Sequence, residues 1–445
     1  MKRFITACLV YLVLLPFVYT SAAATTVKDL RILPQDHTHY LTPGLFSVSK
    51  SMQDPRELRY MTLYFSPWLS DRTPPSLDNL TGHFLRFMEN PGYGENKKKR
   101  TSAWMEKLWQ NADMENYPNA DMTAISLTTA NLRFVPTDKP RYNTPDGYPF
   151  DRFQISSIAP NTPLRILHVT ADKAWFLVRA PQVYGWIASR DMAVVNPTFI
   201  HTWRTGKYAA MIRDKIPLYD QYGNFLFEAP IGAIFPIVEE RDATFRVLVA
   251  VADSNKRGVS ISVSLSKEVA SVRPLHLTEQ NMLKITNDLI NEPYGWGGLY
   301  QNRDCSAMLK DIFAPFGIWL PRHSADQVKE AGYFIDLADM PRQEKEKIIL
   351  EQGVPYLTLL WMKGHIMLYM GVHDGKPLIF HNVWGMTGKK RWNKPLRVYI
   401  GHAAITTLSP VTENGFQDDL IDKIMGMALI FHPENAEFVS SPETD

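Results

Sequence analysis

A lone cysteine at the start of a predicted helix carries the clearest chemical signal in this sequence. Cys305 follows Asp304, and the apolar positions after it recur at helical spacing as far as Phe316. Free backbone N–H groups and the helix dipole favour an anion at such a position, so we expect a lowered thiol pKa. The same N–H groups could donate to an oxyanion on an attacked carbonyl. The pattern predicts that Cys305 is a nucleophile, and a buried, inert thiol is the alternative.

Two histidines on neighbouring apolar segments could serve this nucleophile. His365 and His381 flank a predicted hairpin whose turn includes Asp374-Gly375. A two-residue turn places the histidines on opposite faces, whereas a three-residue loop from His373 pairs His365 with Val383 and puts both on one face. Diagonal neighbours on one face lie about 7–8 Å apart, which suits a base and an orienting residue. We therefore predict the three-residue loop or an equivalent bulge.

This arrangement predicts a nucleophile, a base and an orienting residue. His365 deprotonates Cys305 and later protonates the leaving amine, and His381 holds the tautomer and orientation of His365. One cysteine and two histidines could instead bind zinc with an open position. The sequence has no close ligand pair such as H-x-x-x-H or C-x-x-C near them, so we expect neither a metal nor a cofactor. His323 and His373 are expected at the surface.

The first 24 residues predict export. Lys2 and Arg3 precede an apolar stretch over residues 4–19, and small residues follow up to Ala24, which is the layout of a cleaved secretory signal. A retained N-terminal anchor is the alternative. Cys8 leaves with the signal, so the mature chain keeps one thiol and forms no internal disulfide. Because exported proteins usually pair their cysteines, the remaining thiol suggests a function.

Composition narrows the location and the partners further. No later segment is long and apolar enough to span a bilayer, so we expect no stable membrane insertion after signal removal and a place in the periplasm or cell envelope. The chain has 48 basic and 46 acidic residues, and two of the basic ones belong to the signal. A nearly neutral mature chain argues against a nucleic-acid partner. The basic run at residues 97–100 is expected to be a solvated loop.

After the predicted signal peptide at residues 1–24, changes in the residue pattern divide the chain into four parts. Residues 25–140 are irregular and mostly helical. Residues 141–205 and 206–275 contain short alternating segments, which predict two small β-barrels. Residues 276–445 place helices before strands, so we expect an α+β domain with helices packed on an antiparallel sheet.

Two cap signals locate helices in this last part. Thr278 can cap a helix whose apolar positions recur at helical spacing. Ser324 and Gln327 form a capping-box pattern for a second helix that ends near Gly332.

In combination, the motifs around the cysteine and the histidines resemble those of the NlpC-type cell-wall cysteine peptidases, a papain-like family. The resemblance spans about residues 276–400 and rests on Pro293-Tyr294-Gly295-Trp296-Gly297-Gly298, Arg303-Asp304-Cys305-Ser306-Ala307-Met308-Leu309, Phe316-Gly317-Ile318-Trp319-Leu320-Pro321-Arg322, Ser324, Gln327, Gly364-His365 and Phe380-His381-Asn382. Upstream, Trp175 and the segment at 184–187 are similar to bacterial SH3-like domains, and residues 25–140 resemble the family's stabilising region.

The resemblance implies a papain-like peptidase domain that hydrolyses the γ-D-glutamyl–diamino acid bond of peptidoglycan stem peptides. Members with such barrels favour peptides with a free N-terminal L-alanine, because an SH3-like domain narrows the cleft. Cys305, His365 and His381 match the family's catalytic set. Tyr294 matches the tyrosine placed near the oxyanion.

The resemblance also implies substrate-binding residues. Asp304 and Ser306 match positions that hold the substrate's free amine, and a carboxylate suits an ammonium group; for Asp304 a helix cap alone is the alternative. Tyr184 is the barrel tyrosine expected to contact substrate. The segment 359–364 departs from the family, which often has a Pro-Gly-Asp turn before the histidine.

Two other functions compete with this one. The first is a non-catalytic cell-wall-binding protein, which the two barrels favour and the intact Cys305, His365 and His381 oppose. The second is an acyltransferase or amidase on a related fold that acts on a different acyl donor.

Overall fold

The computed structural model describes residues 27–40, 46–69, 74–391, 394–413, 415 and 417–431. The predicted signal peptide at 1–24 lies outside the described residues, as does the tail after Pro433. Among the helices of the described part, none has the length and apolarity needed to cross a membrane.

The N-terminal region consists of short helices. They are α1 (Asp29–Ile32), η1 (His37–His39), α2 (Lys50–Tyr64), α3 (Ser66–Leu69), α4 (Leu77–Glu89), α5 (Ser102–Ala112) and η2 (Met114–Asn116). The side chains of Ser76 and Thr101 cap α4 and α5 by accepting hydrogen bonds from backbone N–H groups in the first turn. Gln53 on α2 donates to the backbone carbonyls of Leu275 and Phe316, so this helix joins parts of the chain that are distant in sequence.

The first barrel is a seven-stranded antiparallel sheet in the order β3-β2-β6-β5-β4-β1-β7. Its strands are β1 (Met122–Ser126), β2 (Ala130–Arg133), β3 (Gln154–Ile158), β4 (Pro163–Val169), β5 (Trp175–Arg179), β6 (Tyr184–Ala188) and β7 (Met192–Val194), with η3 (Ser189–Asp191) before the last. The sheet starts earlier than the predicted boundary at 141. β1 and β2 belong to a region expected to be helical, but β1 lies between β4 and β7 and therefore finds its partners only in the folded sheet.

The second barrel follows the helix α6 (Pro197–Trp203). It contains β8 (Tyr208–Met211), β9 (Ile216–Tyr219), β10 (Phe225–Ala229), β11 (Ile234–Glu240), β12 (Thr244–Ala252), β13 (Gly258–Ser266) and β14 (Ala270–Val272). Five strands form one sheet in the order β13-β12-β11-β8-β14, and β9 and β10 pair separately. Alternating side chains of both sheets, such as Leu218, Phe235 and Val247, share one apolar core.

The C-terminal domain is α+β, as the order of its segments predicts. Its elements are α7 (Glu279–Asp288), η4 (Trp296–Gln301), α8 (Cys305–Phe313), α9 (Ser324–Glu330), β15 (Tyr333–Asp336), α10 (Arg342–Gln352), β16 (Thr358–Met362), β17 (His365–His373), β18 (Lys376–Arg391), β19 (Lys394–Thr407), α11 (Leu420–Lys423) and β20 (Ile424–Leu429). The six strands form an antiparallel sheet in the order β15-β20-β16-β17-β18-β19.

Helices cover this sheet on both sides. Met308 and Ile312 of α8 share a buried apolar cluster with Phe380 of β18. Ile349 of α10 belongs to a second cluster with Ile379, the next residue of the same strand. Because successive side chains of a strand point to opposite faces, α8 and α10 lie on opposite faces of the sheet.

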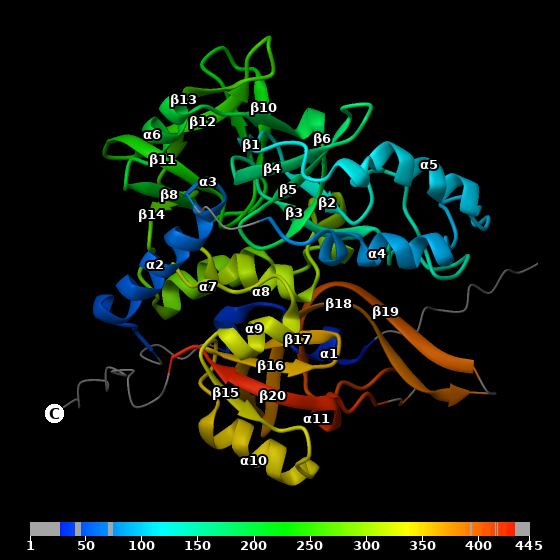
Figure 1. Cartoon of the computed structure of the whole chain (residues 1–445). Helices are drawn as coiled ribbons and strands as arrows, with labels where there is room; N and C mark the ends of the chain where they lie inside the picture. Colours follow the sequence, from blue (N-terminus) through cyan, green and yellow to red (C-terminus); the bar gives the residue numbers. More distant parts are fainter. Residues whose placement is uncertain are drawn as a thin grey trace, which may run out of the picture.

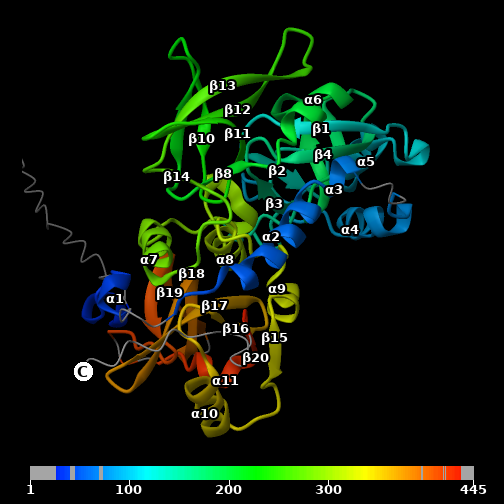
Figure 2. The ribbon, with the colours of Figure 1, turned by 90° about the vertical axis from the view of Figure 1, so that its left-hand side faces the viewer.

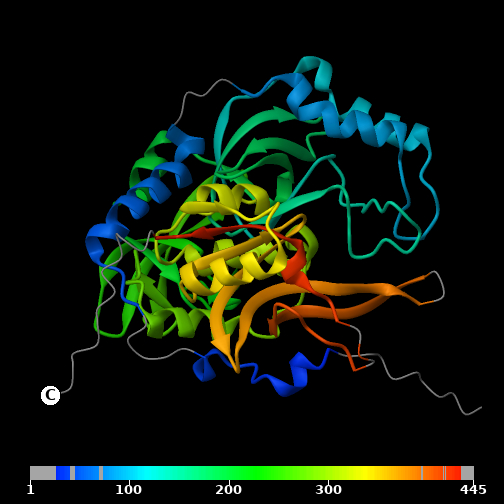
Figure 3. The same cartoon turned by 90° about the horizontal axis from the view of Figure 1, so that it is seen from below.

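The three parts are stacked so that α8 lies between the sheet and the barrels. Figures 1 and 2 show both barrels on one side of the C-terminal domain, with α7 and α8 nearest to them. Figure 3 shows α1 beside the β18–β19 end of the sheet, where the Asp29 carboxylate accepts hydrogen bonds from the N–H and hydroxyl of Thr407 at 2.8 Å each. The cysteine at the start of α8 is therefore placed close to the first barrel.

Of the two predicted caps, the first is confirmed and the second is wrong, although the second helix is present. Thr278 does cap α7, and its hydroxyl accepts from the N–H of Asn281. Ser324, however, is the first helical residue of α9, and the N-cap is His323 without a side-chain cap bond. The amide of Gln327 donates instead to the carbonyls of Ser306 and Pro321 at 2.7 and 2.8 Å, so it is not used for a capping box.

Candidate active site

Cys305 is the first residue of α8, as the sequence predicts. The N-cap is Asp304, whose carboxylate accepts a hydrogen bond of 2.9 Å from the N–H of Ala307. The helix ends at Phe313, one turn before the predicted end at Phe316. Cys305 is 8% exposed, and the backbone N–H of Ile366 on β17 is directed at its sulfur. The thiol thus lies where the start of α8 meets the start of β17.

The electrostatics of the thiol differ from the expectation. Burial raises the pKa of Cys305 to about 12, and the nearby Asp304 carboxylate adds to this rise, whereas the N–H of Ile366 and the Arg322 guanidinium lower the pKa. The predicted lowering is therefore wrong, because the helix dipole is outweighed by loss of water around the sulfur and by an adjacent negative charge.

The base candidate is likewise neutral. Burial lowers the pKa of His365 to about 4, and the opposing effect of Asp304 is smaller. Within the described residues the thiol makes no side-chain hydrogen bond to His365, and catalytic hydrogen bonds are often long before substrate binds. The resting site therefore pairs a neutral thiol with a neutral imidazole.

The two histidines are adjacent, and a bulge achieves this. The hairpin has the two-residue Asp374-Gly375 turn, with His373 paired to Lys376, so the three-residue loop is not formed. The register then shifts between Tyr369 and Gly371, and this bulge is the predicted equivalent. As a result, Nε2 of His365 lies 2.9 Å from Nδ1 of His381.

A threonine on the neighbouring strand favours one set of proton positions in this pair. The hydroxyl of Thr406 donates to the carbonyl of Thr407 at 3.1 Å, and its oxygen lies 3.3 Å from Nε2 of His381. That oxygen can accept the Nε2 proton of His381, so Nδ1 of His381 accepts the Nε2 proton of His365. The remaining nitrogen of His365, Nδ1, then carries a free lone pair and is the basic atom.

His381 is suited to this accepting role because it stays uncharged. It is 2% exposed, and burial lowers its pKa well below the usual value, with smaller contributions from the charges of His365 and His402. A neutral imidazole at this position can hold the tautomer of His365 without adding a positive charge.

Asp304 is already paired before any substrate binds. Its two oxygens accept from the Arg322 guanidinium at 3.1 and 2.7 Å, and one also accepts from the N–H of Gly297 at 3.0 Å. The Ser306 hydroxyl accepts from Arg322 at 2.8 Å. Burial raises the pKa of Asp304, but Arg322 and the N–H groups outweigh it and hold the pKa below the usual value. These contacts support the helix-cap alternative for Asp304, and its role in binding an amine remains a prediction.

The two tyrosines lie in different places. Tyr294 lies in the loop before α8. Burial is the main cause that raises its pKa, and the nearby charge of Cys305 is the second. Its role near the oxyanion remains a prediction. Tyr184, at the start of β6, borders a cavity whose walls include His83 and His323. Its contact with substrate remains a prediction.

Several residues around the site have roles that the sequence did not assign. Arg322 belongs to a motif that was recognised, but its partners Asp304 and Ser156 are distant in sequence. Thr406 had no signal beyond its place on a strand. Arg303 binds Asp214 of the second barrel at 2.6 and 2.8 Å and Asp311 of α8 at 2.7 Å, which fixes that barrel to the domain.

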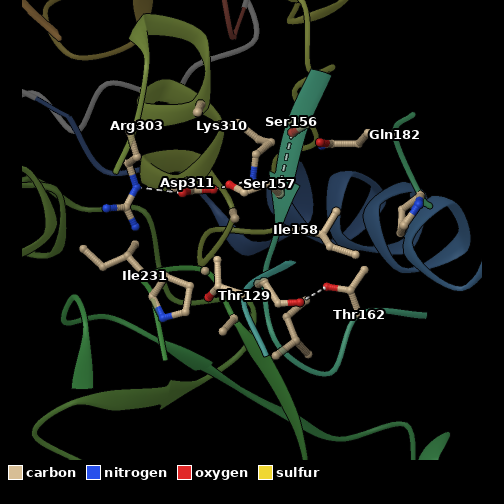
Figure 4. Close-up of a pocket in the computed structure, with 18 of the residues that line it drawn as sticks. Thr129, Ser156, Ser157, Ile158, Thr162, Gln182, Ile231, Arg303, Lys310 and Asp311 are labelled. Carbon is tan, nitrogen blue, oxygen red and sulfur yellow. Dashed lines mark hydrogen bonds and ion pairs between the residues drawn. The ribbon is translucent and has the colours of Figure 1, made fainter. Parts of the chain in front are cut away.

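A separate cavity lies behind α8, between the helix and both barrels. Figure 4 shows Arg303, Lys310 and Asp311 on one side of it and Ser156 and Ser157 of β3 on another. Its lining residues Ala307 and Lys310 of α8, and Ala314 just after the helix, are offset from Cys305 by about half a helical turn. The cavity therefore faces away from the thiol.

Comparison with family models identifies four segments. Residues 4–117 match the NLPC_P60 stabilising domain, residues 140–188 an SH3 domain of SH3b1 type, and residues 196–242 an SH3 domain of SH3b2 type. Residues 291–391, which include the cysteine and both histidines, match the NlpC/P60 family.

Comparison with solved structures also returns matches. The chain is similar to a novel NlpC/P60 endopeptidase from Photobacterium damselae subsp. piscicida, with 26% identity, a TM-score of 0.79, and coverage of 89% of this chain and 97% of that one. An NlpC/P60 family protein from Bacillus cereus ATCC 10987 matches with 16% identity, a TM-score of 0.46, and coverage of 69% of this chain and 98% of that one. No match was found among curated protein sequences.

Proposed function

Because the chain belongs to the NlpC/P60 family of cysteine peptidases, we propose that it is an exported endopeptidase that hydrolyses the γ-D-glutamyl–diamino acid bond of peptidoglycan stem peptides. We further propose that it favours peptides with a free N-terminal L-alanine. The observation that supports the proposal most directly is the placement of Cys305 at the start of a helix, beside the strand that carries His365 and its partner His381.

The first half of the reaction follows from the proton positions. Nδ1 of His365 takes the proton of the Cys305 thiol as the sulfur attacks the carbonyl carbon of the scissile amide. The N–H groups at the start of α8, together with the Tyr294 hydroxyl, stabilise the negative charge on the carbonyl oxygen. When the C–N bond breaks, His365 returns its proton to the leaving amine, and an acyl thioester on Cys305 remains.

The second half restores the thiol. A water molecule gives a proton to His365 and attacks the thioester carbonyl, and the C–S bond breaks. The sulfur takes the proton back from His365, and the glutamyl carboxylic acid leaves. His381 acts in both halves by holding the Nε2 proton of His365, so that Nδ1 is always the atom that faces the reaction.

Because the resting thiol and imidazole are both neutral, the proton transfer occurs during attack rather than before it. Substrate that displaces water and places a carbonyl near the α8 N–H groups would stabilise the developing charge. The mechanism therefore requires no preformed thiolate.

The substrate's amino end is proposed to bind near the Asp304 and Ser306 pair, with Tyr184 contributing from the first barrel. Asp304 already carries hydrogen bonds from Arg322 and two backbone N–H groups. We therefore expect Ser306 and Tyr184 to affect substrate binding more directly than Asp304 does.

The experiment is to incubate the purified chain with L-Ala-γ-D-Glu-diaminopimelate and to detect release of the L-Ala-D-Glu dipeptide. Cys305→Ala should abolish release. The same peptide with a blocked N-terminus, and intact sacculi, would define the preference for a free amine. If neither the wild type nor Cys305→Ala releases product while the wild type binds sacculi, the chain is a wall-binding protein and the proposal is wrong.

A further inference from the structure

A side chain of the first barrel contacts an arginine that supports the candidate active site. Ser156, on the edge strand β3, lies with its hydroxyl oxygen 2.8 Å from Nε of Arg322 in the C-terminal domain. Both side chains are buried, at 3% and 5% exposure. The two residues are 166 positions apart in sequence, so the contact exists only because the barrel docks on the domain.

The direction of this hydrogen bond is defined. The Ser156 hydroxyl donates its proton to the carbonyl of Ser157 at 2.9 Å. Figure 4 shows the two serines together on β3, joined by this bond. The oxygen of Ser156 is thereby oriented to accept the Nε–H of Arg322.

The other two nitrogens of Arg322 reach the start of α8. They donate to both oxygens of Asp304 at 3.1 and 2.7 Å and to the hydroxyl of Ser306 at 2.8 Å. Asp304 and Ser306 flank Cys305. A guanidinium presents its N–H donors in a fixed plane. The hydrogen bond from Nε to Ser156 therefore holds the other two nitrogens in one orientation toward Asp304 and Ser306.

A second contact joins β3 to the same carboxylate. The amide of Gln154 donates to the carbonyl of Gly297 at 3.0 Å, and the N–H of Gly297 donates to Asp304 at 3.0 Å. Gly298 approaches β3 so closely that a Cβ atom there would lie 2.0 Å from the Ser157 hydroxyl. The strand therefore supports Asp304 from two directions.

The charged and titratable groups around the thiol come from four segments. Asp304 precedes α8, Arg322 precedes α9, His365 begins β17, and Tyr294 precedes α8 in the loop that leads to η4. Asp304 raises the thiol pKa and Arg322 lowers it. The balance between these two opposite charges depends on how firmly the guanidinium is held.

We propose that Ser156 is a positioning residue of the peptidase: it fixes Arg322 on Asp304 and Ser306, and so makes the first barrel a part of the catalytic centre. The inference rests on the proposed function for its effect on peptide cleavage. Its effect on the thiol itself can be measured without any peptide. A barrel that acted only as a tethered wall-binding module would not influence the thiol.

The test compares Ser156→Ala with Ser157→Ala in the full chain. Rates of Cys305 alkylation by iodoacetamide are followed from pH 6 to 11 by mass spectrometry of the peptide that contains Cys305, so that Cys8 does not interfere. Ser156→Ala leaves the Nε–H of Arg322 buried without an acceptor and loosens its contact with Asp304. The thiol pKa should then rise, and alkylation at pH 8 should slow about tenfold, because one pKa unit changes the thiolate fraction about tenfold.

Ser157→Ala is the matched control, since it removes a neighbouring hydroxyl from the same strand and should leave the alkylation profile unchanged. Ser156→Thr, which keeps an acceptor, should restore the wild-type profile. In the peptide assay Ser156→Ala should lower kcat with little change in KM. Far-ultraviolet circular dichroism and Tm show whether each variant is folded.

The inference is overturned if folded Ser156→Ala is alkylated like the wild type at every pH, or if Ser156→Thr behaves like Ser156→Ala. If Ser156→Ala does not fold, Gln154→Glu, which loses the amide donor to the Gly297 carbonyl, must shift the profile while Ser156→Thr keeps the wild-type profile. An unchanged profile in Gln154→Glu then overturns the inference. If Cys305 of the wild type is alkylated but the wild type cleaves no peptide, the proposed substrate is wrong. The alkylation rates of the variants still test the inference about Ser156.

Discussion

His365 and His381 are joined through Nε2 and Nδ1 at 2.9 Å, although the turn between their strands would place them on opposite faces of the hairpin. The bulge between Tyr369 and Gly371 corrects the register. A bulge adds one residue to one strand and therefore reverses the facing of every side chain beyond it. The contact between the two histidines thus depends on one extra residue, Met370, located five positions from His365.

Loss of either reacting group should abolish peptide cleavage. Cys305→Ala and His365→Ala are each expected to lower kcat/KM at least a thousandfold, since a nucleophile and its base act as one unit. His373→Ala is the control on the same strand, because its ring lies at the hairpin turn beside Asp374. A loss of activity in His373→Ala comparable to that in His365→Ala would contradict the assignment of the base.

Thr406 should tune the base through His381. Thr406→Val removes the oxygen that accepts the Nε2 proton of His381, and an unpaired buried donor costs about 1–3 kcal/mol. We expect kcat to fall about tenfold with KM unchanged, because each 1.4 kcal/mol corresponds to a factor of ten. Thr406→Ser retains the oxygen and should keep full activity. If Thr406→Val has wild-type kinetics, Thr406 does not influence the tautomer of His381, and this prediction is wrong.

Gly298 should be intolerant of any side chain for a reason beyond its backbone conformation. Gly298 and Gly223 both have φ of +83°, but a Cβ at Gly298 would meet Ser157 at 2.0 Å, whereas nothing lies within 4 Å at Gly223. Gly223→Ala should cost about 1 kcal/mol in the free energy of unfolding, because alanine disfavours the left-handed backbone conformation. Gly298→Ala should cost at least about 2 kcal/mol more, because the barrel must move away from η4. Urea denaturation measures both, and equal costs would contradict the close approach.

Stability should fall with acid because His37 is buried without charge. Its ring is fully buried, Nδ1 lies 3.0 Å from the Tyr356 hydroxyl, and burial lowers its pKa to about 3. The unfolded chain binds this proton near pH 6.5, so the stability is present above that pH and is lost as the pH falls toward 3. Between pH 7 and 5 the loss from this group is about 2 kcal/mol.

The check is the free energy of unfolding at pH 7 and pH 5 for wild type and His37→Gln. The variant cannot take up the proton and should lose less stability by about 2 kcal/mol over this interval. His39→Gln, at an exposed neighbouring position, should follow the wild type. If His37→Gln and wild type change in parallel, His37 does not titrate in the unfolding reaction.

The sequence by itself determined the local elements and singled out the candidate reacting groups. Short-range rules located Cys305 at a helix start with Asp304 as its cap, and Thr278 at another helix start, because capping involves residues only two or three positions apart. Side-chain alternation required either a longer loop or a bulge in the hairpin, and the bulge is present. Local periodicity was sufficient for these features because their partners are near in sequence.

Only the tertiary structure decided the protonation of the site and its support. The dipole of α8 favours a thiolate, but burial and Asp304 favour the neutral thiol. The burial of the sulfur depends on all the segments that pack around it. The contact of Ser156 with Arg322 likewise depends on docking between parts 166 residues apart, for which no local pattern exists. Residue type and spacing therefore single out the candidate reacting atoms, while the electrostatic environment that sets their reactivity is assembled from side chains that meet only in the folded chain.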